Sequence, residues 1–284
     1  MKIIVLGGTG LLGEAVMRAC QGLGHEAVAA SRASKAMPLD ITDRRHIADA
    51  VAAYKPEVMI NCAAIASIDA CESQPGKAFE VNAAPVAELA QLSRRGGFKL
   101  VHISTDHFFT GDGDARHGED APVTLVNEYA KSKYAAEASA ALAPGALTVR
   151  TAFVGRTSAR AGGFAEQVHA ALRKGEELTL FEDAYTSLLH VSAVADAMLR
   201  LIACKAAGII NVASRDVFTK ADLIRAFARK LNMPLKAKSG SVKSLAIPRA
   251  ESLGLAVGKA EGLLGGAMPG FDDTVGLLAA DFAH

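Results

Sequence analysis

The sequence predicts an α/β fold, a doubly wound parallel sheet with a smaller C-terminal lobe. Two features of the first 150 residues support this. Short apolar runs rich in Val and Ile alternate with helix-like stretches. Most of these runs lack polar alternation, which is typical of strands covered on both faces. Strands that alternate with helices indicate βαβ units, and right-handed crossovers then leave few topologies.

The expected elements follow in chain order. Strands are predicted at 2–6, 26–30, 57–61, 98–103 and 146–150, and helices at 11–23, 43–53, 75–95 and 127–142. Beyond these, a Gly-containing segment at 155–163 leads into elements predicted at 164–174 (helix), 178–181 (strand), 192–204 (helix), 208–213 (strand) and 219–231 (helix). Thr219 is a plausible N-cap for the last of them. We expect residues 1–155, rejoined by 190–213, to form one domain, and residues 156–189 and 214–284 to form the smaller lobe.

Composition excludes several classes of protein. The chain has 284 residues, a formal net charge of +1 and 50% hydrophobic residues. These values argue against disorder, and against nucleic acid or an anionic membrane as the main partner. No apolar stretch approaches the ~20 residues of a membrane-spanning helix, and the start MKIIVLGGTG is too short for a signal-peptide core. Four scattered cysteines without a C-x-x-C pair indicate a reduced, cytoplasmic protein, and the histidines show no metal-ligand spacing, so we expect no metal.

A glycine-rich loop follows the first strand directly. Gly7, Gly10 and Gly13 form G-x-x-G-x-x-G between a predicted strand and a predicted helix. In that context glycines permit a tight turn, a close approach of backbone to a pyrophosphate, and close helix packing. The free N–H groups and the helix dipole face the anion. The pattern predicts a Rossmann-like dinucleotide-binding domain, and the absence of G-K-[ST] excludes a nucleotide-hydrolysing P-loop.

The end of the second predicted strand bears on the choice of cofactor. An acidic residue there would bind the adenine ribose hydroxyl of NAD. This chain has Ser31 and Arg32 instead, which suit a 2′-phosphate, so NADP(H) is favoured over NAD(H). Asp40, after a short third-strand candidate, is placed to accept a hydrogen bond from the adenine amino group.

A candidate catalytic site combines a helix with a strand end. Tyr129 and Lys133 form Y-x-x-x-K, and the i, i+4 spacing puts both side chains on one helix face. A nearby ammonium stabilises a phenolate and lowers the pKa of the phenol. Ser104, Thr105 and Asp106 follow the fifth predicted strand, at the edge where open α/β sheets bind ligands. There a hydroxyl can donate to a substrate carbonyl while Tyr129 supplies the proton.

The motifs in this order resemble those of an extended short-chain dehydrogenase/reductase, and within that group the dTDP-4-dehydrorhamnose reductase family. The matching segments cover the first 155 residues well and the later part loosely. They are GGTGLLG at 7–13, NCAAIASIDACESQP at 61–75, VN at 81–82, STDHFFTG at 104–111, NEYAKSKYAAE at 127–137 and RTAFVG at 150–155. The resemblance implies an NADP(H)-dependent reductase of a nucleotide-linked 4-keto-6-deoxy sugar.

The resemblance also implies roles for individual residues. Tyr129 is the expected proton donor, Lys133 its partner and Thr105 the hydroxyl that orients the carbonyl. Phe153 falls where the family carries an aromatic residue near the substrate and nicotinamide, and with Ser104, Thr105 and Asp106 it completes the expected substrate contacts. Beside Tyr129 and Lys133, the expected cofactor-binding residues are Gly7, Gly10, Leu11, Leu12, Gly13, Arg32, Asp40, Ile41, Ala63 and Ala64.

The chain departs from the family pattern on the substrate side. Ile65 and Ala66 stand where the family has a His or Tyr and then a Thr, Phe153 replaces a usual Trp, and segments 184–187 and 248–252 match only in part. Two alternatives therefore stay open, a non-catalytic NADP-binding regulatory subunit and a nucleotide-sugar 4-epimerase. A dehydratase would need an acidic residue after Asp106, where the chain has His107.

Surface composition leaves the oligomeric state open. The helical stretches 75–95 and 127–142 carry Ala-rich surfaces. Such surfaces fit packing on the sheet, and they also fit the pairing of two copies into a homodimer, as the corresponding helices of many short-chain reductases do.

Overall fold

The structure is a computed structural model that describes residues 1–156 and 162–283. The chain folds into two compact units. Unit 1 holds Met1–Thr105, Asn127–Arg150 and Ala195–Ile210, and unit 2 holds the remaining described residues. The domain boundaries expected from the sequence stay a prediction. Within the described residues, no helix is long and apolar enough to cross a membrane.

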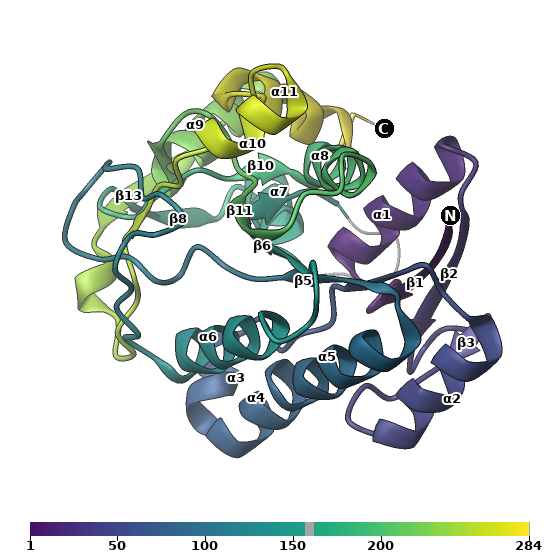
Figure 1. Ribbon diagram of the computed structural model, residues 1–284. Helices are drawn as coiled ribbons and strands as arrows, with labels where there is room; N and C mark the ends of the chain where they lie inside the picture. Colours follow the sequence, from purple (N-terminus) through teal and green to yellow (C-terminus); the bar gives the residue numbers. More distant parts are fainter. Residues whose placement is uncertain (157–161, 284) are drawn as a thin grey trace. The chain divides into compact units, whose positions relative to one another are not determined.

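Unit 1 is built on a seven-stranded sheet (Figure 1). The strand order is β11-β6-β5-β4-β1-β2-β3, and every pair from β6 to β3 runs parallel. The chain winds outward from β1 through β2 to β3, then returns past β1 to β4 and continues in the opposite direction. The strands are β1 (Lys2–Leu6), β2 (Glu26–Ser31), β3 (Met37–Pro38), β4 (Val58–Asn61), β5 (Lys99–Ile103), β6 (Leu147–Arg150) and β11 (Gly208–Asn211). This topology confirms the predicted doubly wound sheet.

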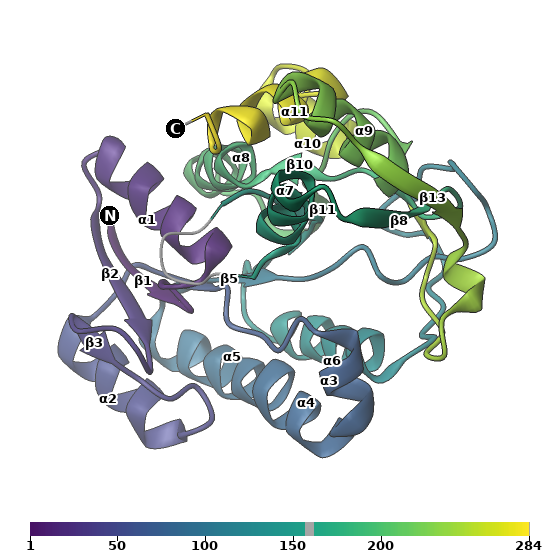
Figure 2. The ribbon, with the colours of Figure 1, turned by 180° about the vertical axis from the view of Figure 1, so that it is seen from behind.

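Helices cover both faces of this sheet. α1 lies on one face, while α2, α4, α5 and α6 lie on the other (Figures 1 and 2). Side chains of β1, β4 and β5 pack there against Ala136 and Ala140, whose small size lets α6 come close to the sheet. The helices are α1 (Leu11–Gly22), α2 (Arg44–Tyr54), α3 (Ile68–Ser73), α4 (Pro75–Asn82), α5 (Ala84–Gly96) and α6 (Glu128–Ala140), and α8 (Val191–Ala203) runs from unit 2 into unit 1.

One expected helix is divided. The sequence predicts a single helix over 75–95, but α4 ends at Asn82 and α5 begins at Ala84. Pro85 explains the break, because a proline in a helix interior removes a backbone donor and its ring clashes with the preceding turn. At the second position of a new helix it costs nothing. α3 was not expected, and it is capped by Ser67, whose hydroxyl accepts from Ala70 N–H at 3.2 Å.

In the part that the structure describes, unit 2 combines short strands with several helices and a 3₁₀ turn. The helices and the turn are α7 (Phe164–Lys174), α9 (Lys220–Lys230), α10 (Gly258–Leu264), α11 (Phe271–Ala280) and η1 (Val242–Ser244). The strands are β7 (Phe153–Val154), β8 (Glu177–Phe181), β9 (Tyr185–Thr186), β10 (Leu189–His190), β12 (Phe218–Thr219), β13 (Lys236–Gly240) and β14 (Ser252–Leu253). Aromatic and aliphatic side chains of α7, α9 and α11 form its core.

In the later part of the chain, the predicted elements are present, but several further elements were not predicted. The elements expected at 164–174, 178–181, 192–204, 208–213 and 219–231 are present as α7, β8, α8, β11 and α9. Thr219 caps α9 in a capping box with Asp222. Five very short strands were not expected, since two residues leave no periodic pattern. Of the segment 155–163, residues 157–161 lie outside the described residues.

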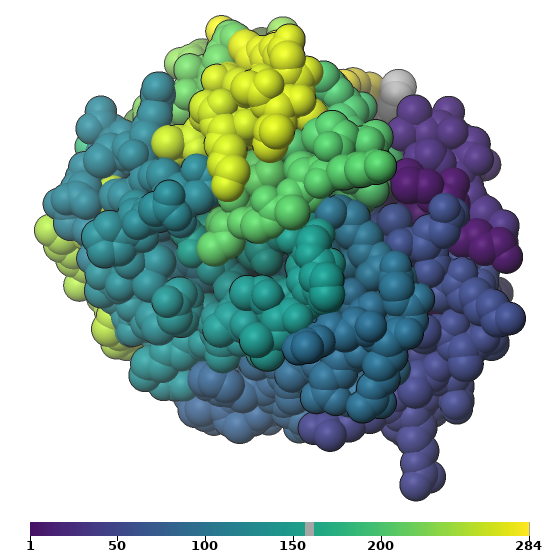
Figure 3. Space-filling model, in the orientation of Figure 1, coloured from purple at the N-terminus to yellow at the C-terminus, as the bar shows by residue number. Residues whose placement is uncertain are grey.

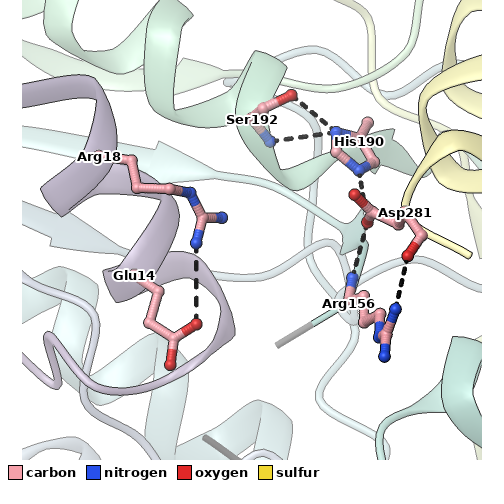
Figure 4. A network of polar contacts seen from close by, with 6 residues as sticks. All are labelled: Glu14, Arg18, Arg156, His190, Ser192 and Asp281. Atoms are coloured by element: carbon pink, nitrogen blue, oxygen red, sulfur yellow. Dashed lines mark hydrogen bonds and ion pairs between the residues drawn. The ribbon is translucent and has the colours of Figure 1, made fainter. Parts of the chain in front are cut away.

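Polar contacts fasten the C-terminal helix within unit 2 (Figure 4). His190 Nδ1 accepts from Ser192 N–H at 3.3 Å and so caps the start of α8. His190 Nε2 lies 3.1 Å from the Asp281 carboxylate, which also accepts from Arg156 N–H at 2.9 Å. The same figure draws the Glu14–Arg18 ion pair of α1, which belongs to unit 1.

Candidate active site

The turn from β1 to α1 has a shape that only glycine permits. Gly7 has φ +72°, and a Cβ on it would lie 2.8 Å from Ala63 N. A Cβ on Gly13 would lie 2.2 Å from Gly7 O, so α1 sits directly on the turn. Gly7 N–H donates to Ala30 O at 2.8 Å, which fixes the turn against β2. The turn is therefore wedged between β2 and the segment that follows β4.

This turn fits a pyrophosphate. α1 begins after Gly10, which offers no side-chain cap. The N–H groups of a first helical turn have no partner inside the helix, and the dipole there favours an anion. A Cβ on Gly10 would meet only Gly7 O, at 3.3 Å, so the space beside Gly10 is otherwise open for a ligand. Leu11 and Leu12 contribute the first backbone N–H groups of this cradle.

Gly8 was not singled out by the sequence. A Cβ on it would lie 2.6 Å from Ala29 Cβ and 2.9 Å from Val5 O. Because Gly8 has no side chain, the turn can pack closely against β2. The adjacent glycines Gly7 and Gly8 were the feature of the sequence that could have indicated this role.

The expected adenosine contacts follow β2 and β3. Thr9 and Ser31 share a hydrogen bond between their hydroxyls at 2.9 Å, which joins the glycine loop to the end of β2. Arg32 is exposed beyond it. Asp40 accepts from Thr42 N–H at 2.9 Å and from the Thr42 hydroxyl at 2.8 Å. These hydrogen bonds, with a smaller effect of the Arg32 charge, lower the pKa of Asp40. Ile41 is half-buried beside it.

The segment after β4 is held from two sides. Asn61 Oδ1 accepts from Ala63 N–H at 3.1 Å. The side chain of Asn82 binds both backbone groups of Ile65, at 2.7 Å to the N–H and 3.1 Å to the oxygen. Ala63 and Ala64 lie between these two anchors, next to the glycine turn.

Tyr129 and Lys133 lie on the buried face of α6. Asn127 caps the helix by accepting from Ala130 N–H at 2.9 Å. The Lys133 ammonium donates to Ile103 O at 2.6 Å, at the last residue of β5. Its side chain is almost fully buried, and this burial lowers the pKa of Lys133 to about 8, although the negative charge of Glu137 acts in the opposite direction.

Ser104 and Thr105 continue the chain from Ile103, and both are buried. Ser104 N–H donates to Val149 O at 2.7 Å, which prolongs the pairing of β5 with β6. The Ser104 hydroxyl forms no hydrogen bond with the part of the chain that the structure describes.

Two polar networks at this site were missed by the sequence analysis. Asn82 donates to the Ser132 hydroxyl at 3.0 Å, which in turn donates to Tyr129 O at 2.8 Å. Glu137 and Arg150 form a buried bidentate ion pair. In both networks, a polar residue among apolar positions was the feature of the sequence that could have indicated the contact. Glu137 also continues the i, i+4 spacing of Tyr129 and Lys133.

The predicted site residues divide between the units. Unit 1 contains most of them, namely the glycine-rich turn, Arg32, Asp40, Ala63, Ala64, Ser104, Thr105, Tyr129 and Lys133. Asp106 and Phe153 belong to unit 2, where Asp106 is buried and Phe153 begins β7. Burial lowers the pKa of the neighbouring His107 to about 3, so this histidine is neutral at physiological pH.

Comparison with known proteins agrees with this arrangement. Residues 1–281 match the family described as RmlD substrate binding domain. A probable low-salt glycan biosynthesis reductase of Haloferax volcanii is 30% identical, with 100% of this chain and 99% of the relative covered. The dTDP-4-dehydrorhamnose reductase of Escherichia coli is 28% identical, with 87% of this chain and 85% of that protein covered.

Solved structures share the fold. The dTDP-4-dehydrorhamnose reductase of Bacillus anthracis, in complex with NADP, has a TM-score of 0.90 at 23% identity and covers 99% of both chains. The UDP-glucose 4-epimerase of Thermus thermophilus, in complex with NAD, has a TM-score of 0.84 at 22% identity, again over 99% of both chains. The chain therefore belongs to the RmlD substrate binding domain family and is an NAD(P)-dependent reductase of the short-chain dehydrogenase/reductase type.

Proposed function

We propose that the protein is an NADP(H)-dependent reductase of a nucleotide-linked 4-keto-6-deoxy sugar, with Tyr129 as the proton donor. One observation carries the proposal. α6 presents Tyr129 and Lys133 on one face, and the Lys133 ammonium is seated on Ile103 O, two residues before Thr105. Together, a phenol, an ammonium and a hydroxyl can orient a carbonyl oxygen and protonate it while a hydride reduces the carbon.

Each group has a separate task. When bound, the nicotinamide supplies the hydride that reduces the carbonyl carbon. Thr105 donates a hydrogen bond to the carbonyl oxygen and orients it. Tyr129 transfers its phenolic proton to that oxygen as negative charge develops there. The Lys133 ammonium stabilises the phenolate that remains and binds the nicotinamide ribose.

The chain also supplies the cofactor and substrate contacts. The pyrophosphate lies on the N–H groups of residues 10–13, and Arg32 binds the 2′-phosphate of NADP. Asp40 and Ile41 contact the adenine, and Ala63 and Ala64 line the path of the cofactor. Ser104, Asp106 and Phe153 complete the contacts with substrate.

The names of relatives support the substrate class. Matching proteins include a dTDP-4-keto-6-deoxy-D-glucose reductase of Streptomyces niveus, 34% identical over 47% of this chain, beside several proteins named dTDP-4-dehydrorhamnose reductase. Ile65 and Ala66 replace residues that the family pattern has on the substrate side.

NADPH oxidation against a panel of nucleotide-linked 4-keto-6-deoxy sugars tests the proposal. The expected result is turnover of at least one sugar, and this turnover should fall sharply in Tyr129→Phe. NADPH binding without turnover of any sugar would contradict it. Capture of a partner enzyme whose activity the protein changes would then favour the regulatory subunit.

We also propose that the protein forms a homodimer through the helices of 75–95 and 127–142, which are α4, α5 and α6. Parts of the outer surfaces of α5 and α6 are visible in Figure 3. Tyr134 on α6 is 41% exposed and Leu142, just beyond it, is 63% exposed. Light scattering of the wild-type protein and of Tyr134→Glu measures the molar mass. A monomeric wild type would exclude this dimer.

A further inference from the structure

Glu137 and Arg150 form a buried ion pair beside the catalytic lysine. Arg150 Nε donates to one carboxylate oxygen at 2.9 Å, and a terminal nitrogen donates to the other at 2.8 Å. Both side chains are almost completely buried, at 4% and 3% exposure. A bidentate guanidinium–carboxylate pair fixes orientation as well as distance. No step of the proposed reaction uses either residue directly.

We propose that the Glu137–Arg150 pair is a positioning device for Lys133, which holds the ammonium on Ile103 O and against the phenol of Tyr129. This inference rests on the proposed function and deepens it. Glu137 and Arg150 touch neither substrate nor cofactor in this assignment, because they act through Lys133.

The geometry of α6 gives the first argument. Tyr129, Lys133 and Glu137 recur at four-residue intervals, so they form one row on the helix face toward the sheet. Lys133 binds the last residue of β5, and Glu137 binds the last residue of β6. These strands are neighbours, with Ile103 paired to Val149. The helix is therefore attached to two adjacent strand ends, one turn apart, and cannot rotate about its axis without breaking one attachment.

The electrostatic surroundings of Lys133 give the second argument. The titratable groups that interact electrostatically with it are Glu137 on α6, Cys62 after β4, Cys71 on α3 and His102 on β5. Tyr129 lies one turn earlier on α6, and Arg150 on β6 is paired with Glu137. Burial lowers the pKa of His102 well below its usual range, so this imidazole is neutral. Burial also raises the pKa of Cys62 to about 12 and that of Cys71, so both thiols are protonated. Glu137 therefore supplies the negative charge that favours the ammonium form.

Stability alone does not explain the pair. Desolvation of two buried charges often offsets their attraction, and an apolar pair of similar volume is often as stable or more so. The position of the pair next to Lys133 offers another explanation. The pair holds the ammonium in place and favours its charged form.

The titration of Lys133 tests the proposal without substrate or cofactor. NMR of protein labelled at the lysine ε-carbon follows this residue, whose signal is assigned by its absence in Lys133→Met. The wild type titrates near pH 8, and Glu137→Gln titrates at lower pH. If the pKa falls by about one, the charged fraction at pH 8 falls about fivefold. Glu182→Gln is the matched control, since Glu182 forms a bidentate pair with Arg225 in unit 2.

The variants separate positioning from simple structural support. Glu137→Asp keeps the charge and restores most of the titration, whereas Arg150→Lys keeps a cation without the planar fork and lowers kcat with little change in KM. Should Glu137→Gln fail to fold, the double variant Glu137→Leu/Arg150→Met replaces the pair with apolar residues. A folded variant of either kind in which Lys133 titrates as in the wild type overturns the proposal.

Activity then gives a separate readout. In an active wild type, loss of Glu137 moves the alkaline limb of the kcat profile to lower pH, and an unchanged profile would contradict the proposal. A wild type that reduces no sugar refutes the proposed function, while the NMR titration still decides the role of the pair.

Discussion

The ammonium of Lys133 donates to the carbonyl oxygen of Ile103 at 2.6 Å, and this contact joins the middle of α6 to the end of β5. The residues that follow Ile103 are Ser104 and Thr105. One hydrogen bond thus couples the helix that carries Tyr129 to the strand end that Ser104 and Thr105 follow.

Replacement of Tyr129 by Phe removes the proposed proton donor and leaves the ring. Turnover should fall by roughly 10²–10⁴-fold, the contribution typical of a general acid. NADPH affinity, measured by fluorescence titration, should change little because the other expected cofactor contacts remain. Turnover equal to that of the wild type would remove Tyr129 from the mechanism.

Arg32→Ala should distinguish the two cofactors. Arg32 is exposed beyond β2 and has no role in the core, so the variant should fold normally. Its NADPH affinity should fall far more than its NADH affinity, because only NADPH carries the 2′-phosphate. Isothermal titration with both cofactors measures the two losses, and equal losses would show that Arg32 does not bind that phosphate. Lys35→Ala, in the same loop, is the control.

Gly13→Ala should damage the cradle. The added methyl group would lie 2.2 Å from Gly7 O, so the turn must move. We expect a lower melting temperature and loss of cofactor binding. Gly22→Ala is the control in the same helix, since a Cβ there meets nothing within 4 Å. It should be neutral, or stabilise by up to about 1 kcal/mol. A Gly13→Ala protein that binds NADPH like the wild type would contradict the packing argument.

Lys133→Met should stabilise the free protein in a manner that depends on pH. Burial lowers the pKa of Lys133 from 10.5 to about 8, so the unfolded chain binds more protons between these values. Wild-type stability therefore rises with pH from 8 to 10.5, and below pH 8 the buried charge imposes its full cost. That cost is about 3 kcal/mol, since 10.5 − 8 = 2.5 and one pKa unit corresponds to about 1.4 kcal/mol.

Urea denaturation at pH 7 and at pH 10 measures this effect. The advantage of Lys133→Met over the wild type should be larger at pH 7. A difference independent of pH would mean that Lys133 keeps its ordinary pKa in the folded protein.

Several features could be predicted because they depend on local patterns. The run KIIVL before G-x-x-G-x-x-G indicated a strand, a turn and a helix, and β1, the turn at Gly7 and α1 occupy those positions. Thr219 before α9 was recognisable because a capping residue acts on the next three backbone groups. The last 50 residues gave no such pattern, since β14 and β13 are short or polar strands that depend on partners far along the chain.

By itself, the sequence determined the alternation of the main strands and helices in the first 150 residues, the glycine-rich turn, and the row of Tyr129 and Lys133 on one helix face, because these follow from neighbouring residues and helix periodicity. Only the tertiary structure decided that Lys133 binds Ile103, that Asn82 holds Ile65, and that Glu137 meets Arg150. Each of these contacts joins residues from separate elements, and spacing within an element cannot specify which strand end a buried polar group will reach. The parallel sheet decides it, because it brings the carboxyl ends of β4, β5 and β6 to one edge.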